Sequence, residues 1–228
     1  MGERVLILGG TREAVALAAA LVDAGHDVTS SLAGRTKEPR PLMGRVRIGG
    51  FGGAQGLAAF LREERIDRLV DATHPFAVRI SANAVAAAKL AGIPVERHER
   101  APWREGPGDR WQHVGSIEEA VASLRSDERV LLALGSQHIA PFAARTDVAF
   151  LVRMVDAPAI PLALPNSQIV LGRPSADPRD EERLLAEHRI DRIVCRNSGG
   201  PGAYAKLIAA RRLGLPVTMI ARPSFPGS

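Results

Sequence analysis

Residues 4–14 read RVLILGGTREA, and this stretch decides the fold class of the chain. A short apolar run ends in Gly9 and Gly10, and the alanine- and leucine-rich segment 14–21 follows at once. This order predicts a buried parallel strand that turns directly into a helix. Unpaired backbone N–H groups and the dipole at such a helix N-terminus favour a phosphate. Because the full Gly-x-Gly-x-x-Gly pattern is absent, a plain strand-to-helix connection is an equal alternative.

The composition is that of a globular protein. The chain has 228 residues and 46% hydrophobic content, enough to bury the core of one large domain or two small ones. No run reaches the roughly 18 apolar residues that span a bilayer, and no charged-then-apolar leader precedes Arg4. The single Cys195 excludes an internal disulfide and a multi-cysteine metal site. We therefore expect a cytoplasmic protein that binds neither membrane nor metal.

The charge pattern favours a small polyanionic ligand. A formal net charge of +5 and a pI near 10.3 are compatible with nucleic-acid binding. However, basic and acidic residues are interspersed, and aromatic residues make up only 4%, too few for base-stacking platforms. Almost all cations are arginines, which bind carboxylates and phosphates through two parallel hydrogen bonds. Codon bias is the alternative explanation for the arginines.

The chain contains an internal repeat. Three pairs of segments resemble each other at offsets of about 122 to 126 residues. The pairs are Arg4–Gly9 with Arg129–Gly135, Arg65–Val70 with Arg189–Val194, and Ala88–Val95 with Ala210–Val217. A nearly constant offset in all three pairs indicates two related halves.

Strands that alternate with helices predict an α/β fold of two Rossmann-like, doubly wound parallel-sheet halves, residues 1–104 and 105–228. Ligands are expected at the carboxyl ends of the strands and in a cleft between the halves. In the first half we expect strands at 4–8, 27–32, 45–48, 67–72 and 94–98, and helices at 12–24, 54–65 and 76–91. In the second half we expect strands at 129–134, 148–153, 168–171, 191–195 and 216–221, and helices at 116–126, 178–188 and 202–213. The stretch 101–109 is the predicted linker, and exchange of a strand between the two sheets stays open.

Polar motifs directly follow the predicted strands of the first half, so they meet at one sheet edge. The second strand lacks the terminal acid with which NAD enzymes bind the ribose. Hydroxyls and a cation stand there instead and suit the 2′-phosphate of NADP; an exposed loop is the alternative. The candidate cofactor-binding residues are Gly9, Gly10, Thr11, Arg12, Glu13, Ser31, Gly34, Arg35, Thr36, Gly50, Phe51, Gly52, Gly53, Thr73, His74 and Pro75.

The motif after the fourth strand is the one place where a catalytic side chain is a candidate. Asp71 either takes part in chemistry or only caps or braces the turn, and Thr73 either takes part in chemistry or binds cofactor through its side chain. His74 binds cofactor or acts as the proton donor, for which histidine is the most easily tuned side chain. Pro75 is expected at the first position of the following helix. The Gly50–Gly53 loop either lets a flat or phosphorylated group approach the backbone or is a flexible turn.

The second half supplies the candidate substrate-binding residues, which follow its strands or lie on the next helix. A solvated surface charge is the alternative for any single arginine, whereas Cys195, Trp103 and Trp111 are expected to serve packing. These candidates are Arg153, Arg196, Asn197, Ser198, Gly199, Gly200, Lys206 and Arg222.

Five segments in this order and spacing resemble the precorrin-6A reductase family, and the resemblance runs essentially end to end. Gly-Gly-Phe-Gly-Gly followed by Asp-Ala-Thr-His-Pro-Phe is its most specific combination. One departure stands out, because the family pattern has lysine where Arg196 precedes Asn-Ser-Gly-Gly. Positive charge is kept, but a lysine-specific proton transfer is put in doubt. The segments are Leu6–Ala14, Ser31–Thr36, Gly49–Gly53, Asp71–Ala77 and Asn197–Gly200.

The resemblance implies an enzyme of cobalamin biosynthesis that transfers hydride from NADPH to one double bond of precorrin-6A, giving precorrin-6B. The substrate is a macrocycle with many carboxylates, which accounts for the arginines. NADPH is expected on the first half and the macrocycle in the cleft against the second. The protein supplies position and charge, and the proton comes from water or from the substrate itself. A monomer suffices, and the product is expected to pass to the next enzyme of the pathway.

Three other functions fit parts of this pattern. A reductase of another polyanion would share the cofactor half. A nucleotide-sensing module would bind NADPH without consuming it. A nucleic-acid binder would show strong, salt-sensitive binding, which the dispersed charges argue against.

Overall fold

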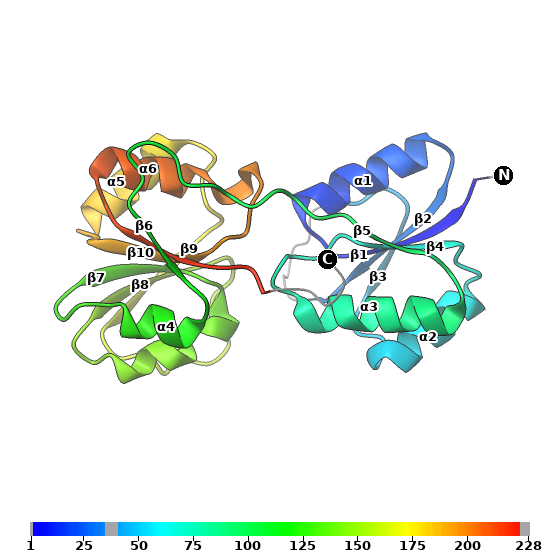
Figure 1. Ribbon diagram of the computed structural model, residues 1–228, viewed down its shortest axis with the longest axis horizontal. Helices are drawn as coiled ribbons and strands as arrows, with labels where there is room; N and C mark the ends of the chain where they lie inside the picture. Colours follow the sequence, from blue (N-terminus) through cyan, green and yellow to red (C-terminus); the bar gives the residue numbers. More distant parts are fainter. Residues whose placement is uncertain (1, 35–40, 224–228) are drawn as a thin grey trace. The chain divides into compact units, whose positions relative to one another are not determined.

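The computed structural model describes residues 2–34 and 41–223, and this part of the chain forms two compact units (Figure 1). They meet in sequence between Arg100 and Ala101, at the start of the stretch 101–109 that the sequence predicts as a linker. None of the described helices has both the length and the apolar character that a bilayer crossing needs.

The first unit is a five-stranded parallel sheet in the order β3-β2-β1-β4-β5. Helix α1 lies on one face, and α2 and α3 lie on the other (Figure 1). This strand order is that of a Rossmann half. The elements are β1 (Arg4–Leu8), α1 (Arg12–Asp23), β2 (Asp27–Leu32), β3 (Arg45–Ile48), α2 (Gly53–Glu63), β4 (Arg68–Asp71), α3 (Val78–Ala91) and β5 (Val95–Arg97).

The apolar run of β1 explains why this strand is central. Val5 and Ile7 pack in one cluster with residues of α1, and Leu6 and Leu8 pack in another with residues of α2 and α3. Successive side chains of a strand point to opposite faces. A strand covered by helices on both faces must therefore be apolar at nearly every position, as β1 is.

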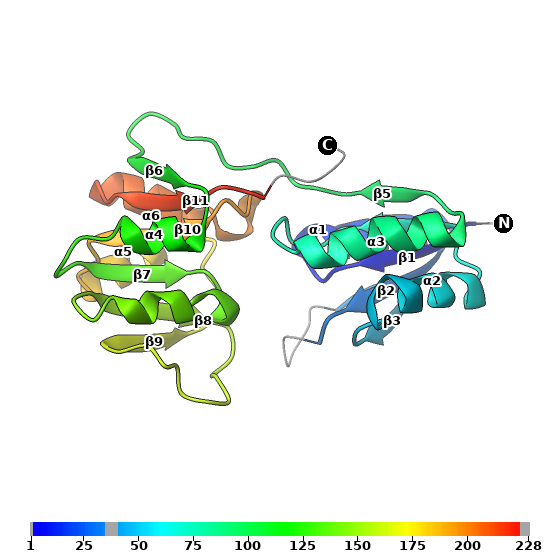
Figure 2. The same ribbon diagram turned by 60° about the horizontal axis from the view of Figure 1, so that its bottom comes forward.

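The second unit is a six-stranded parallel sheet in the order β6-β11-β10-β7-β8-β9 (Figure 2). Its strands are β6 (Trp111–Val114), β7 (Arg129–Ala133), β8 (Ala149–Met154), β9 (Ser167–Leu171), β10 (Arg192–Arg196) and β11 (Val217–Ile220). Its helices are α4 (Ile117–Ala122), α5 (Pro178–Glu187) and α6 (Ala205–Leu213), with three short 3₁₀ helices, η1 (Ser136–His138), η2 (Ala140–Ala144) and η3 (Pro201–Ala203).

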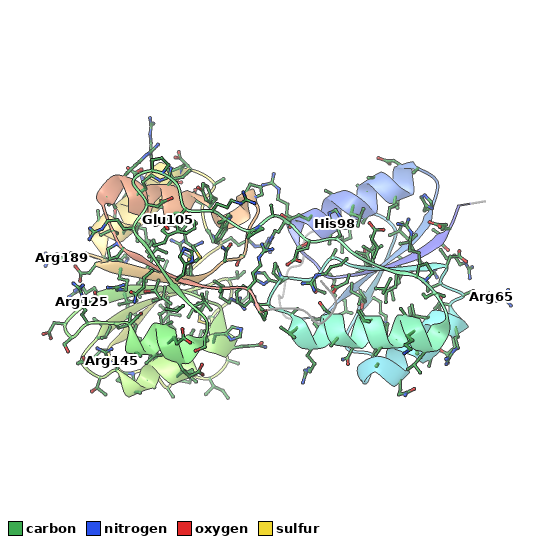
Figure 3. The ribbon with its side chains drawn as sticks, in the orientation of Figure 1. Arg65, His98, Glu105, Arg125, Arg145 and Arg189 are labelled. Carbon is green, nitrogen blue, oxygen red and sulfur yellow. The ribbon has the colours of Figure 1, made fainter. Side chains whose placement is uncertain are left out.

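The internal repeat is confirmed in the topology and in individual hydrogen bonds. Without β6, the second sheet has the strand order of the first, with β7 in the place of β1. Asp67 Oδ2 accepts from the backbone N–H of Arg4 at 2.7 Å, and Asp191 Oδ2 accepts from that of Arg129 at 2.8 Å. Arg65 and Arg189, labelled in Figure 3, precede these aspartates with φ of 49° and 50°. The two halves thus share their turn geometry.

The structure corrects four expectations about elements, one of which is the start of α6, at Ala205 instead of residue 202. Strand β6 was not expected; it follows the linker and pairs with β11. Helix α3 begins at Val78, because the backbone N–H of Ala77 donates to His74 O at 2.7 Å and closes a turn first. Pro75 therefore sits in that turn, where its fixed φ suits the second position, rather than opening the helix. Helix α4 ends at Ala122, four residues earlier than expected.

Candidate active site

The carboxyl ends of β1, β2, β3 and β4 form one edge of the first sheet. Leu8 lies opposite Ser31 on one side and opposite Asp71 on the other. Hydrogen bonds continue past the strands: Gly9 N–H donates to Ser31 O at 3.0 Å, and Ala72 N–H donates to Leu8 O at 3.0 Å. The loops that follow these strands therefore lie side by side, as the sequence predicts.

The first loop is tightly built, and its backbone requires glycine at Gly9. Gly9 has a φ of +118°, and a Cβ there would lie 2.7 Å from Ala72 O. A Cβ at Gly10 would lie 2.8 Å from a methyl carbon of Leu32. Thr11 caps α1, since its Oγ1 accepts from Ala14 N–H at 3.1 Å and donates to Ala72 O at 3.1 Å. The backbone N–H groups of the first turn of α1 begin directly after this cap.

The two charged residues that open α1 differ in their surroundings. Arg12 is exposed. Glu13 Oε2 lies 2.9 Å from Arg100 Nη1, and both side chains are mostly buried. Arg100 therefore compensates the charge of Glu13 at the start of α1. Sequence reasoning missed Arg100, because 87 residues separate the partners.

The loop after β4 is braced by a buried carboxylate. Asp71 is 5% exposed, and its Oδ1 accepts from Thr73 N–H at 3.1 Å and Thr73 Oγ1 at 2.6 Å. Thr73 Oγ1 also lies 3.3 Å from Ser81 Oγ. His74 Nδ1 accepts from Phe76 N–H at 3.3 Å, so a neutral His74 carries its proton on Nε2. Asp71 therefore holds the turn that carries His74.

The loop after β3 presents bare backbone. At Gly49, Gly50, Gly52 and Gly53, a Cβ would meet nothing within 4 Å. Phe51 does not share this openness, since its ring packs edge-on against Phe60 of α2 with centroids 5.1 Å apart. Four open glycines in five residues let a ligand approach the main chain closely.

The end of β2 carries no acidic side chain in its described part. Ser31 is buried next to the end of β1, and Gly34 follows with a φ of +69°. The candidates Arg35 and Thr36 lie outside the described residues.

In the second unit, two of the candidate cations point into the interior. Arg153 of β8 pairs with Glu181 of α5 at 2.7 Å, with side chains 8% and 2% exposed. Lys206 of α6 donates to Ala203 O at 2.7 Å and lies 4.6 Å from the centre of the Trp103 ring. Burial lowers the pKa of the Lys206 ammonium. Both side chains are therefore buried in contacts within the second unit.

Arg196, at the end of β10, contacts a histidine from the loop after β7. Its Nη1 lies 3.0 Å from His138 Nε2. A guanidinium has only donors, so Nε2 is the acceptor. Because β10 and β7 are neighbours in the sheet, this contact joins two loops at the carboxyl edge. His138 was not among the sequence candidates.

The Asn-Ser-Gly-Gly loop, residues 197–200, is held by Trp103 of the linker and by Arg222, which follows β11. Asn197 accepts from Trp103 N–H at 2.8 Å and donates to Trp103 O at 2.9 Å. The Trp103 indole donates to Gly200 O at 2.7 Å. Arg222 donates to Asn197 O at 2.9 Å and Ser198 O at 3.2 Å. A Cβ at Gly199 would collide with Ala101 O. Asn197, Trp103 and Arg222 therefore shape this loop.

Among the described residues, neither carboxyl edge carries a cluster of side chains that could bind a metal ion. Across residues 2–34 and 41–223, no three histidine, cysteine, aspartate or glutamate side chains gather as a metal site would require.

These features define a class. Two parallel sheets of Rossmann order, one with glycine-rich loops at its carboxyl edge, are typical of a two-unit, Rossmann-like α/β protein.

The comparisons with known proteins give the family. The family model described as "Precorrin-6x reductase CbiJ/CobK" matches residues 4–228, and the chain belongs to this family. The precorrin-6A reductase of Rhodobacter capsulatus is 47% identical over 224 residues, 98% of this chain and 89% of that protein. That of Mycobacterium tuberculosis is 48% identical over 225 residues, covering 98% and 90%. The cobalt-precorrin-6A reductase of Priestia megaterium is 30% identical, covering 97% and 91%.

A solved structure agrees with this assignment. "CobK precorrin-6A reductase" superposes with a TM-score of 0.95 at 46% identity, over 100% of this chain and 91% of that one. The family is one of reductases, which implies a nicotinamide cofactor.

Proposed function

We propose that this chain reduces one double bond of precorrin-6A with NADPH, giving precorrin-6B in cobalamin biosynthesis. The first unit holds the cofactor, and the carboxyl edge of the second sheet anchors carboxylates of the macrocycle. One observation carries the proposal: the full-length match to this family coincides with glycine-rich loops at the carboxyl edge of the first sheet.

The residues at that edge fit a dinucleotide. The N-terminus of α1, with Gly9, Gly10 and Thr11, would hold the pyrophosphate. The open glycines after β3 and the imidazole of His74 would line the rest of the cofactor. When bound, a reduced nicotinamide supplies the hydride.

We propose NADPH rather than NADH as this cofactor. An acid at the end of β2 would repel a 2′-phosphate, and Ser31, Leu32, Ala33 and Gly34 include none. Arg35 and Thr36 then supply the positive charge and hydroxyl that a 2′-phosphate prefers. Steady-state rates with NADPH and NADH test this preference, and equal kcat/KM values would contradict it.

The substrate's carboxylates would meet Arg196, Ser198 and the backbone of Gly199 and Gly200. Arg153 and Lys206 would support the fold of the unit from inside rather than bind a carboxylate directly, since their side chains are buried and Arg153 is paired with Glu181. Arginine at 196 keeps the charge that a carboxylate needs.

We propose that the cobalt-free macrocycle is the substrate. The relatives named precorrin-6A reductase are 47–48% identical to this chain, whereas those named cobalt-precorrin-6A reductase are 29–30% identical. Parallel assays with the two macrocycles test this proposal, and faster turnover of the cobalt form would contradict it.

We propose that no side chain is the obligatory proton donor and that water or the substrate provides the proton. Among the described residues, His74 is the candidate that the sequence analysis named at this edge. We expect His74→Ala to weaken NADPH binding while keeping kcat at saturating ligands within about tenfold of wild type, since general acids contribute 10²–10⁴-fold. Loss of turnover with both ligands bound normally would show that His74 is the donor.

The proposed function is tested by mixing the protein with precorrin-6A and NADPH and following nicotinamide absorbance. Oxidation that requires the macrocycle supports a reductase. Binding of NADPH without consumption would instead support a nucleotide-sensing module, and consumption only with another polyanion would assign a different substrate.

A further inference from the structure

Arg47, on the edge strand β3, makes an unusual set of contacts with the glycine-rich loop that follows it. Its Nη1 donates to Gly49 O at 2.6 Å, and its Nη2 donates to Gly50 O at 2.8 Å. The guanidinium carbon lies 3.9 Å from the centre of the Phe51 ring. One side chain therefore contacts three consecutive residues of the loop.

The ring that Arg47 covers is itself fixed on α2. Phe51 packs edge-on against Phe60, whose ring centre is also within 5.5 Å of the Arg47 guanidinium carbon. The carbonyl of Phe51 fits where Gly56 has no side chain, because a Cβ there would collide with that oxygen. The loop is thus held from the strand side by Arg47 and from the helix side by Phe60 and Gly56.

The loop needs such support because of its composition. Gly49, Gly52 and Gly53 have φ values between +79° and +114°. Glycines lose the most conformational freedom when they are ordered. If the loop ordered only on binding, that entropy would be subtracted from the affinity for the cofactor, whereas a loop ordered beforehand avoids the loss.

From this geometry we propose that Arg47 is a positioning residue for the cofactor: it fixes the glycine loop, Gly49–Gly53, in its binding conformation without contacting the nicotinamide. The inference rests on the proposed function, which places the cofactor against this loop. It assigns a role to a side chain that contacts neither of the other two candidate cofactor loops in the described structure.

The test uses three variants of the full chain. Arg47→Met removes the two hydrogen bonds and the charge. Arg47→Lys keeps the charge but cannot bridge two carbonyls with a planar fork while lying flat on a ring. Arg45→Met is the matched control, because Arg45 lies on the same strand and its substitution removes the same charge. Its side chain is 53% exposed and pairs only loosely with Asp27 and Glu64, at 3.3 and 3.4 Å.

We expect Arg47→Met to bind NADPH about tenfold more weakly in equilibrium titrations and to keep its kcat at saturating NADPH. Arg47→Lys should stay weakened, and Arg45→Met should bind as wild type does. Phe51→Leu should also weaken binding, and its effect should not add fully to that of Arg47→Met, because the two side chains are in contact.

Wild-type affinity in Arg47→Met, full rescue by Arg47→Lys, or an equal loss in Arg45→Met would overturn the proposal. Full rescue by lysine would instead indicate a direct ion pair with a cofactor phosphate.

Amide hydrogen exchange of the free protein separates this proposal from the proposed function. Arg47→Met should accelerate exchange of the Gly49–Gly53 amides, and Arg45→Met should not. If wild type fails to bind NADPH, the proposed function fails and the positioning role with it, even where exchange shows that Arg47 orders the loop. If wild type binds but exchange in the loop is unchanged by Arg47→Met, only the role of Arg47 falls.

Discussion

Single residues at the cofactor edge do different work from what their chemical type suggests. Asp71 is the clearest case, because a carboxylate at a strand end is a natural candidate for catalysis. In the structure, Asp71 accepts two hydrogen bonds from Thr73, and both of them stabilise the turn. The same holds in the second unit for Arg153, whose charge faces Glu181. The role of such a side chain depends on its burial and on its hydrogen-bonding or charged partner, and neither can be read from the sequence.

We expect Asp71→Ala to destabilise the fold by about 2 kcal/mol, because it leaves the N–H and hydroxyl of Thr73 without their acceptor. NADPH affinity should fall as well, since the turn carries His74. Thr73→Ser keeps both hydrogen bonds and serves as the control. Thermal unfolding and NADPH titration measure the two effects, and an Asp71→Ala variant as stable as wild type would contradict the bracing role.

Asp109 makes a prediction about acid stability. Burial raises its pKa, but hydrogen bonds from the Arg211 side chain and Gly106 N–H outweigh burial, so the net pKa is lowered below 3.8. A depressed pKa means that the stabilisation is complete above the unfolded value and is lost as pH falls through the folded one.

Asp109→Asn should therefore lower stability by about 2 kcal/mol at neutral pH and by progressively less below pH 3.8. Denaturant titrations across this range check the expectation. A difference between wild type and variant that is constant down to the most acidic buffer would be the contrary result.

At the scale of elements, two glycines that each follow a strand of the first sheet differ in whether the backbone needs glycine there. Gly9→Ala should cost about 2 kcal/mol or more, because the residue has positive φ and its Cβ would meet Ala72 O. Gly50→Ala should leave stability unchanged, since its Cβ would enter open space. It should nevertheless weaken NADPH binding if that space receives the cofactor.

Unfolding curves and NADPH titrations on the two variants separate these effects. A Gly50→Ala variant that binds NADPH normally would remove this loop from the cofactor site.

Sequence patterns predicted most elements because both faces of each central strand are buried. Strand β6 escaped prediction, since its four residues, Trp111–Val114, show neither an apolar run nor alternation. The predicted start of α3 was wrong because a proline such as Pro75 suits both the first position of a helix and the second position of a turn. Short edge strands and helix starts depend on tertiary contacts that local patterns do not encode.

The candidate site was predictable where a motif follows a strand, because parallel strands bring such motifs to one edge. It was not predictable where a distant side chain acts. Arg100, Arg47 and His138 lack any motif of their own, and their roles appear only in contacts with Glu13, the glycine loop and Arg196.

At the scale of the whole molecule, the chain is a duplicated α/β unit whose copies have diverged. The first copy keeps a long helix after its first strand, whereas the second has two short 3₁₀ helices there. The second copy instead carries Arg196 and the loop held by Trp103 and Arg222. This difference agrees with the proposal that the first unit binds the cofactor and the second unit binds the anionic substrate.

The most direct test of the proposed reaction, hydride transfer from NADPH to precorrin-6A, is isotope transfer. The protein is incubated with precorrin-6A and NADPH carrying deuterium at both positions of nicotinamide C4, and the macrocycle is analysed by mass spectrometry. The account predicts a reduced macrocycle that has gained one deuterium from the cofactor and one hydrogen from solvent or its own acidic groups. A macrocycle that stays unreduced, or is reduced without the label, would contradict it.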